Sequence, residues 1–154
     1  MTTIDERGAP ADDPGLLRRL LLALMLVGML GLLAELVLLE HFDSGWQWVP
    51  LVLLGLGTVL GVAVWLRPGP ATLRAFRALS ALFVAAGALG MYLHLDGNAE
   101  FERESDSGLQ GLPLAWEALH GATPALAPGA LVQLGLLGLV LAFRHPALRR
   151  GRAG

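Results

Sequence analysis

Cysteine and lysine are both missing from this chain, and charged residues of any kind are scarce. The 154 residues are 55% hydrophobic and only 16% charged. Without cysteine the chain can form no disulfide, iron–sulfur cluster or thiolate zinc site. A soluble domain has about a quarter of its residues charged, so lipid rather than water must cover much of this surface. The composition therefore predicts a membrane protein.

The familiar catalytic motifs are missing as well. The sequence contains no G-x-S-x-G, no H-E-x-x-H, no P-loop and no dinucleotide fingerprint. It also lacks the basic, aromatic-rich surface that nucleic-acid binding requires. These absences favour a protein that is not an enzyme, uses no cofactor and binds no nucleic acid.

Four apolar stretches are each long enough to cross a hydrocarbon core of about 30 Å. Backbone in lipid must satisfy its own hydrogen bonds, so these stretches are expected to be helices. The sequence predicts an all-α membrane protein in which four transmembrane helices form two antiparallel hairpins. The predicted spans are residues 20–39, 49–66, 78–95 and 125–143. They lie in a transmembrane domain, 16–146, with an outer loop, 96–124, between a polar N-terminal tail, 1–15, and a basic C-terminal tail, 147–154.

Arginine placement predicts the orientation of these spans. All 11 basic residues are arginine, and only Arg103 falls on the side that carries most of the acidic residues. Basic residues mark the cytoplasmic side, so both termini are expected in the cytoplasm. The polar, acidic N-terminal tail is unlike a cleaved signal peptide, so the first span is expected to be an uncleaved anchor. Heavy use of arginine, alanine, glycine and leucine is typical of a GC-rich bacterial genome, and we expect the bacterial cytoplasmic membrane.

The two predicted hairpins resemble each other, which suggests a tandem duplication. Aligning span one with span three and span two with span four matches Arg18 with Arg77, Glu35 with His94, Pro50 with Pro128, and Pro68 with Pro146. The two copies would share one orientation. Chance agreement between glycine-rich apolar helices is the alternative.

Glycines within the spans are expected to mark helix contacts, because membrane helices associate through close packing at small residues. The glycines concerned are Gly28, Gly31, Gly57, Gly61, Gly87 and Gly90. Glu35 shares the face of Gly28 and Gly31, and His94 shares the face of Gly87 and Gly90. A carboxylate facing lipid is costly, so both faces are expected to point into the bundle.

Three polar side chains inside the spans are candidates for function: Glu35, His94 and Gln133. If their helices are neighbours, Glu35 can accept a hydrogen bond from His94 and the pair would titrate jointly. Two interpretations stay open, a proton-relay or cation site and an interhelical contact that only fixes packing. Gln133 is expected to join helices rather than bind a ligand.

The predicted outer side also carries His41, His94 and His120 among carboxylates. Imidazole and carboxylate form a common transition-metal ligand set, but the spacing of these histidines matches no local ligand motif. We therefore expect no metal. Nor do two histidines clearly face the bundle interior, as a haem would require.

The outer loop is expected to contain helix of its own. Residues 98–106 are expected to extend the third span beyond the bilayer as an acidic helix. In the next segment Leu112, Ala115, Trp116 and Leu119 share one face, the pattern of a short interfacial helix with a tryptophan anchor. Gly121 is expected to end it.

Three segments resemble small uncharacterised four-span bacterial membrane proteins: His94-Leu95-Asp96-Gly97-Asn98, Phe101-Glu102, and residues 122–129. The resemblance implies a four-span fold and carries over no activity and no site residue. The sequence favours a multi-pass membrane protein that is a non-catalytic scaffold or accessory subunit and joins copies of itself or a membrane-protein partner. The alternative is a small proton- or cation-handling transporter or channel component that uses Glu35 and His94.

Overall fold

The structure, a computed structural model, describes residues 14–150. It contains the helices α1 (Pro14–Leu38), α2 (Trp48–Leu66), α3 (Pro70–Ser105), α4 (Gly111–His120), α5 (Gly129–Ala142) and α6 (Pro146–Arg150). Within this range there is no strand, so the predicted all-α class is confirmed. Most of the predicted tail 1–15, and the last four residues of the tail 147–154, lie outside the described residues.

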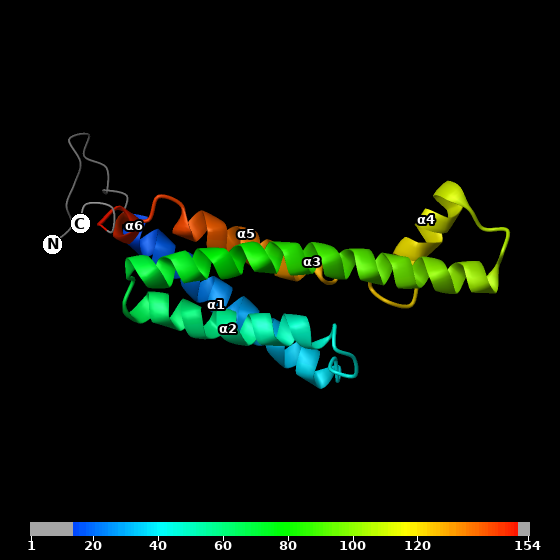
Figure 1. Ribbon diagram of the computed structural model, residues 1–154, viewed down its shortest axis with the longest axis horizontal. Helices are drawn as coiled ribbons and strands as arrows, with labels where there is room; N and C mark the ends of the chain where they lie inside the picture. Colours follow the sequence, from blue (N-terminus) through cyan, green and yellow to red (C-terminus); the bar gives the residue numbers. More distant parts are fainter. Residues whose placement is uncertain (1–13, 151–154) are drawn as a thin grey trace.

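Helices α1, α2, α3 and α5 lie side by side and alternate in direction (Figure 1). Contacts join α1 to α2, α2 to α3 and α3 to α5, and α1 also touches α5. At one end of the bundle α1 begins, α2 turns into α3, and α5 ends. We call it the arginine end, since Arg18, Arg67, Arg74 and Arg144 lie there. The opposite, acidic end carries α4, which stands beyond α1, α2 and α5 (Figure 1).

Three of the helices are long and apolar enough to cross a membrane. They cover Gly15–Leu38, Trp48–Leu66 and Pro70–Ser105, and only a minority of the residues of each are buried in the single chain. An all-round apolar helix whose surface stays uncovered by protein is typical of a helix that faces lipid. The second and third predicted spans thus fall within α2 and α3, and the first lies in α1 except for its last residue. Helix α3 continues unbroken past the third span to Ser105, as residues 98–106 led us to expect.

The fourth predicted span is only partly helical. Of residues 125–143, α5 takes Gly129–Ala142, 14 residues or about 21 Å at 1.5 Å per residue. The helix begins late because Pro124 and Pro128 lack the amide hydrogens that would join the helical ladder. The chain before α5 forms hydrogen-bonded turns, since Ala127 N–H donates to the Pro124 carbonyl and Gly129 N–H donates to the Leu126 carbonyl.

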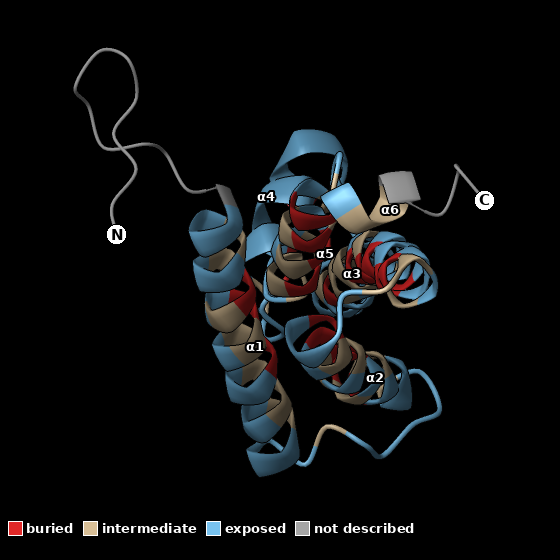
Figure 2. Cartoon of the chain, turned by 90° about the vertical axis from the view of Figure 1, so that its left-hand side faces the viewer, coloured by how far each residue is buried: buried red, intermediate tan, exposed pale blue. Residues whose placement is uncertain are grey.

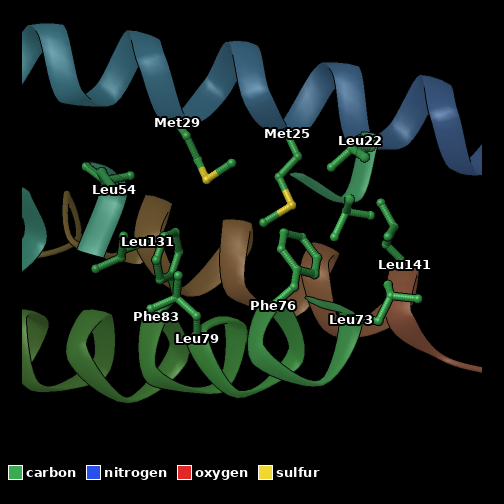
Figure 3. Packing of buried hydrophobic residues seen from close by; sticks show 11 residues of the cluster. Leu22, Met25, Met29, Leu54, Leu73, Phe76, Leu79, Phe83, Leu131 and Leu141 are labelled. Carbon is green, nitrogen blue, oxygen red and sulfur yellow. The ribbon is translucent and has the colours of Figure 1, made fainter. Parts of the chain in front are cut away.

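The core is a row of large apolar side chains between the four long helices. Figure 3 shows Met25 and Met29 reaching from α1 toward Phe76 and Phe83 on α3. Leu54 of α2 and Leu131 of α5 belong to the same cluster. Seen from the arginine end, the buried residues face the middle of the bundle and the exposed ones form its outer surface (Figure 2). Unbranched methionine can fill irregular space in a core of this kind.

The closest helix contact joins α3 and α5, and glycine makes it possible. A Cβ added at Gly87 would lie 2.8 Å from the Pro128 carbonyl oxygen and from the Val132 amide nitrogen. A Cβ at Gly135 would lie 2.6 Å from the Ser80 carbonyl oxygen. Real Cβ atoms do not approach backbone this closely, so the two backbones meet only because these positions have no side chain. This is the small-residue packing by which membrane helices associate.

Helix α2 uses Gly57 and Gly61 in the same way, but against side chains. A Cβ at Gly57 would meet Phe83 and Met29, and one at Gly61 would meet Leu26. Gly90 similarly lies against Pro128, and Gly28 against Leu134. Each of these glycines therefore receives a side chain from a neighbouring helix.

Gly31 and Glu35, which we expected to face the bundle, do not pack into it in the single chain. A Cβ at Gly31 would find nothing within 4 Å, and both residues are exposed. The reason is geometric: Met25 and Met29 point into the core, which turns Gly31 and Ala34 to the opposite side of α1. Only Gly28 of the predicted α1 face has a neighbour.

Candidate functional site

Asn98 holds the acidic end of the molecule together. It lies in the part of α3 that extends beyond the other helices, and only 4% of its surface is exposed. Its Nδ2 donates to the carbonyl oxygens of Ala118 (2.9 Å) and Thr123 (2.7 Å), while its Oδ1 accepts from the Thr123 amide (3.1 Å). A buried amide with both donors and its acceptor in use fixes a unique packing. Asn98 therefore ties α4 and the following turn to α3.

Gly121 allows the chain to pass over this amide. A Cβ at that position would lie 2.5 Å from Cγ of Asn98. The predicted end of α4 at Gly121 is correct, since the helix covers Gly111–His120. Glycine is required here for space, because the backbone crosses directly over the Asn98 side chain.

His94 lies one turn before Asn98 and faces the same loop. Its Nδ1 lies 3.0 Å from the carbonyl oxygen of Pro124. As the donor in this hydrogen bond, the ring joins α3 to the chain that leads into α5. The predicted partner, Glu35, takes no part in it.

Glu35 lies at the surface of the single chain. It is exposed near the end of α1, and among residues 14–150 no side chain bonds to it. The structure of one chain therefore does not bring Glu35 and His94 together, and a relay between them would need groups from outside the chain.

Gln133 also faces outward. It is exposed in the middle of α5, with no hydrogen-bond partner in the described part of the chain. A shallow groove runs along this side of α5, lined by Gly129, Val132, Gln133, Leu136, Leu137 and Val140. An amide in this position keeps its donors and its acceptor free.

The hydroxyl groups inside the bundle, unlike the Gln133 amide, have hydrogen-bond partners. Ser80 is buried and donates to the Phe76 carbonyl at 2.8 Å, and Thr58 donates to the Leu54 carbonyl at 2.9 Å. Both bonds run back to the residue four positions earlier in the same helix, so each hydroxyl is satisfied without a partner helix.

The outer histidines are not assembled as metal ligands. No group of three or more His, Cys, Asp or Glu residues that could hold a metal ion occurs in the described residues. The Nδ1 of His120 instead bonds the Trp116 carbonyl at 2.9 Å, and its ring packs against the Trp116 indole. The His94 ring bonds the Pro124 carbonyl, and His41 lies in the loop after α1.

Helix α4 forms where the sequence predicts it, but it packs with a different face. Leu114 and Ala118 are its buried residues, whereas Leu112, Trp116 and Leu119 stay exposed. An open groove between α3 and α4 is lined by Tyr92, Leu95, Ala99, Ala115 and Leu119, with Asp96 and Arg103 among its other walls. Of the predicted apolar face, Ala115 and Leu119 thus line the groove beside α3, whereas Leu112 and Trp116 are the most exposed.

At the arginine end, His145 sits between α5 and α6. Its pKa is lowered, chiefly because burial disfavours the charged ring and also because Arg18 repels it. The Ala147 amide donates to its Nδ1 at 3.2 Å, an interaction that needs the neutral ring. No sequence pattern singles out His145, since its environment depends on Arg18, which is remote in the chain.

Comparison with protein-family models, with curated proteins and with solved structures finds no match for this chain. Function must therefore be argued from its own geometry.

Asn98 is the buried polar residue whose role sequence reasoning missed. A signal for Asn98 was present, since Gly87, Gly90, His94 and Asn98 follow one another at spacings of three or four residues and so share one side of α3. That side faces α5 and the chain leading into it.

Proposed function

We propose that the chain is a multi-pass protein of the bacterial cytoplasmic membrane that crosses it four times and has both termini in the cytoplasm. In this proposal it is a non-catalytic scaffold or accessory subunit. The observation that carries the proposal is the direction of Glu35 and Gln133. A polar side chain inside the bundle, such as Ser80, has its hydrogen-bond partner within the bundle. Glu35 and Gln133 lie on predicted spans but are exposed, so either lipid or a partner protein must cover them.

At Glu35 and Gln133, contact with a partner protein is energetically more favourable than contact with lipid. An ionised carboxylate within a span costs several kcal/mol at mid-membrane, and an unpaired amide is also unfavourable there. A polar contact with another protein removes much of this cost. Outward polar residues thus support association with other chains, and they do not supply the continuous interior path that a transporter needs.

The fourth crossing is supported by the neighbours of α5. This helix packs along α3. At its start Pro128 contacts Gly90 of α3, and near its end Gly138 contacts Ser80 of α3. The coiled turns that begin at Pro124 extend it toward the acidic end. Together, turns and helix give a crossing antiparallel to α3, with Arg144 at the arginine end.

The absence of cysteine makes this topology directly testable. Single cysteines at exposed positions can be labelled in intact cells with a membrane-impermeant maleimide. Ser44→Cys and Ser107→Cys, at the acidic end, should react at once. Ala71→Cys and Pro146→Cys, at the arginine end, should react only after the membrane is permeabilised. Reaction of Pro146→Cys in intact cells would show that α5 does not cross.

Association is tested by photocrosslinking beside Glu35. A benzoylphenylalanine at Ala34, which is exposed on α1, should yield protein adducts in native membranes. The same group at Val62, exposed on α2 away from any outward polar residue, is the matched control. Equal yields at both positions would count against a specific contact.

A further inference from the structure

The exposed side of α5 carries a shallow groove whose residues recur at helical spacing. The groove residues fall into two overlapping sets, Gly129, Val132, Gln133 and Leu136, and then Gln133, Leu136, Leu137 and Val140. Each set has the spacing i, i+3, i+4, i+7, which is the hole that accepts one side chain of a facing helix in knobs-into-holes packing. Two such holes follow one another along the axis of α5.

The residues that line this side also supply knobs. Gly129, Gln133, Leu136 and Val140 follow at spacings of four, three and four, which is the repeat of a coiled-coil seam, and Phe143 follows directly after the last residue of the helix. Leu136, Val140 and Phe143 are all more than half exposed in the single chain. Helix α5 therefore presents both the side chains that act as knobs and the holes that receive them.

The Gln133 side chain indicates which residue faces it across a contact between two α5 helices. A side-chain amide both donates and accepts, so two glutamines related by a two-fold axis can exchange a pair of N–H···O hydrogen bonds. Membrane helices use such polar contacts to associate, and one polar residue at a central seam position sets the register. The amide has no other partner in the described residues, and its near-central position on α5 places it away from water.

Charge favours α5 over α1 as the two-fold contact. Symmetric pairing through the outward side of α1 would bring two Glu35 carboxylates together in lipid, where like charges repel most strongly. The α5 seam from Gly129 to Phe143 contains no charged residue. Both copies insert in the same orientation, so an axis along the membrane normal makes the two α5 helices parallel and places Gln133 opposite Gln133.

We infer that α5 is a homodimer interface, in which a second copy of this chain packs its own α5 along the Gly129–Phe143 seam and the two Gln133 amides bond to each other. This inference rests on the proposed function, since it names the partner that one of the two outward polar residues meets.

Disulfide crosslinking in native membranes tests the interface, again because the chain has no cysteine of its own. Val140→Cys lies on the seam and is 64% exposed, and matched controls are Val27→Cys on α1 (68%) and Val59→Cys on α2 (66%). Under mild oxidation Val140→Cys should form disulfide dimers at least about fivefold faster than either control. Equal or faster crosslinking of a control would overturn the α5 interface.

Energy transfer between labelled chains in phosphatidylcholine liposomes tests the role of Gln133. Gln133→Leu should weaken dimerisation by about 5- to 30-fold, the range expected for an interhelical polar contact, and Gln133→Asn should retain most of it. Unchanged dimerisation in Gln133→Leu would refute the amide pair. If the chains associate but Val140→Cys does not crosslink, the α5 interface is wrong while the scaffold proposal stands; if they do not associate at all and no other protein joins them, both are wrong.

Discussion

Asn98 and Thr123 bond to each other in both directions, although they lie on different segments of the chain. The Asn98 amide donates to the Thr123 carbonyl at 2.7 Å and accepts from the Thr123 N–H at 3.1 Å. Four residues earlier on the same side of α3, His94 bonds the adjacent carbonyl of Pro124. These contacts give the acidic end a fixed shape, although it stands beyond the other long helices.

Replacing Asn98 with leucine should release α4 from α3. The carbonyls of Ala118 and Thr123 and the Thr123 amide would lose their partner, at about 1–3 kcal/mol for each group left buried and unsatisfied. Hydrogen exchange followed by mass spectrometry should show faster exchange in α4, with α1 and α2 unchanged. Gln110→Leu, an exposed change beside α4, is the control. Native-like exchange in Asn98→Leu would mean that the apolar contacts of Leu114 and Ala118 suffice.

Gly87→Ala should destabilise the bundle, because its new methyl group would meet the backbone of Pro128 and Val132. Overpacking of this kind costs about 1–3 kcal/mol. Gly31→Ala is the matched control: it also lies within a long helix, but its methyl group would meet nothing within 4 Å. Thermal unfolding in detergent should therefore show a lower Tm for Gly87→Ala and an unchanged or higher Tm for Gly31→Ala. A similar Tm for both variants would mean that α3 and α5 are not in close contact.

Acidification should loosen the arginine end through His145. Since its pKa is lowered in the folded chain, the unfolded chain binds more protons as the pH falls below about 6.5, its unfolded value. The stability that neutral His145 contributes is thus present above that pH and is lost as the pH falls toward the lower folded pKa. NMR titration of the ring should find this low value, and Arg18→Gln should raise it. A ring that titrates at the ordinary value in both proteins would refute the contact.

The purified protein should not conduct protons. In one chain Glu35 faces outward and His94 bonds Pro124, so no relay joins them. Liposomes containing the protein should acidify in response to a pH gradient no faster than empty liposomes, and Glu35→Gln and His94→Ala should change nothing. Proton flux in the wild type that both variants abolish would favour the transport alternative.

The sequence predicted the helices better than their faces. Long apolar runs bounded by arginine, proline and tryptophan predicted α1, α2 and α3, because helix formation in lipid depends on local composition. The predicted start of the fourth span at residue 125 is earlier than the observed start of α5 at Gly129, because Pro124 and Pro128 lack the amide hydrogens that would join the helical ladder.

The polar residues were identified from sequence, but their partners were not. Periodicity places Gly31 and Glu35 on one side of α1, yet which side meets the bundle depends on how Met25 and Met29 pack against α2 and α3. The bond of His94 to a backbone carbonyl leaves no trace in side-chain spacing. Such long-range choices are made by tertiary packing and cannot be derived from the pattern of one helix.

The mass of the complex in native membranes tests association most directly. The protein can be extracted with a polymer that retains its surrounding lipid and then weighed intact by native mass spectrometry. We expect particles that contain more than one protein chain, either copies of this 16.3 kDa chain or this chain with a partner. Particles with a single 16.3 kDa chain, at the protein density of the native membrane, would contradict a scaffold that acts through Glu35 and Gln133.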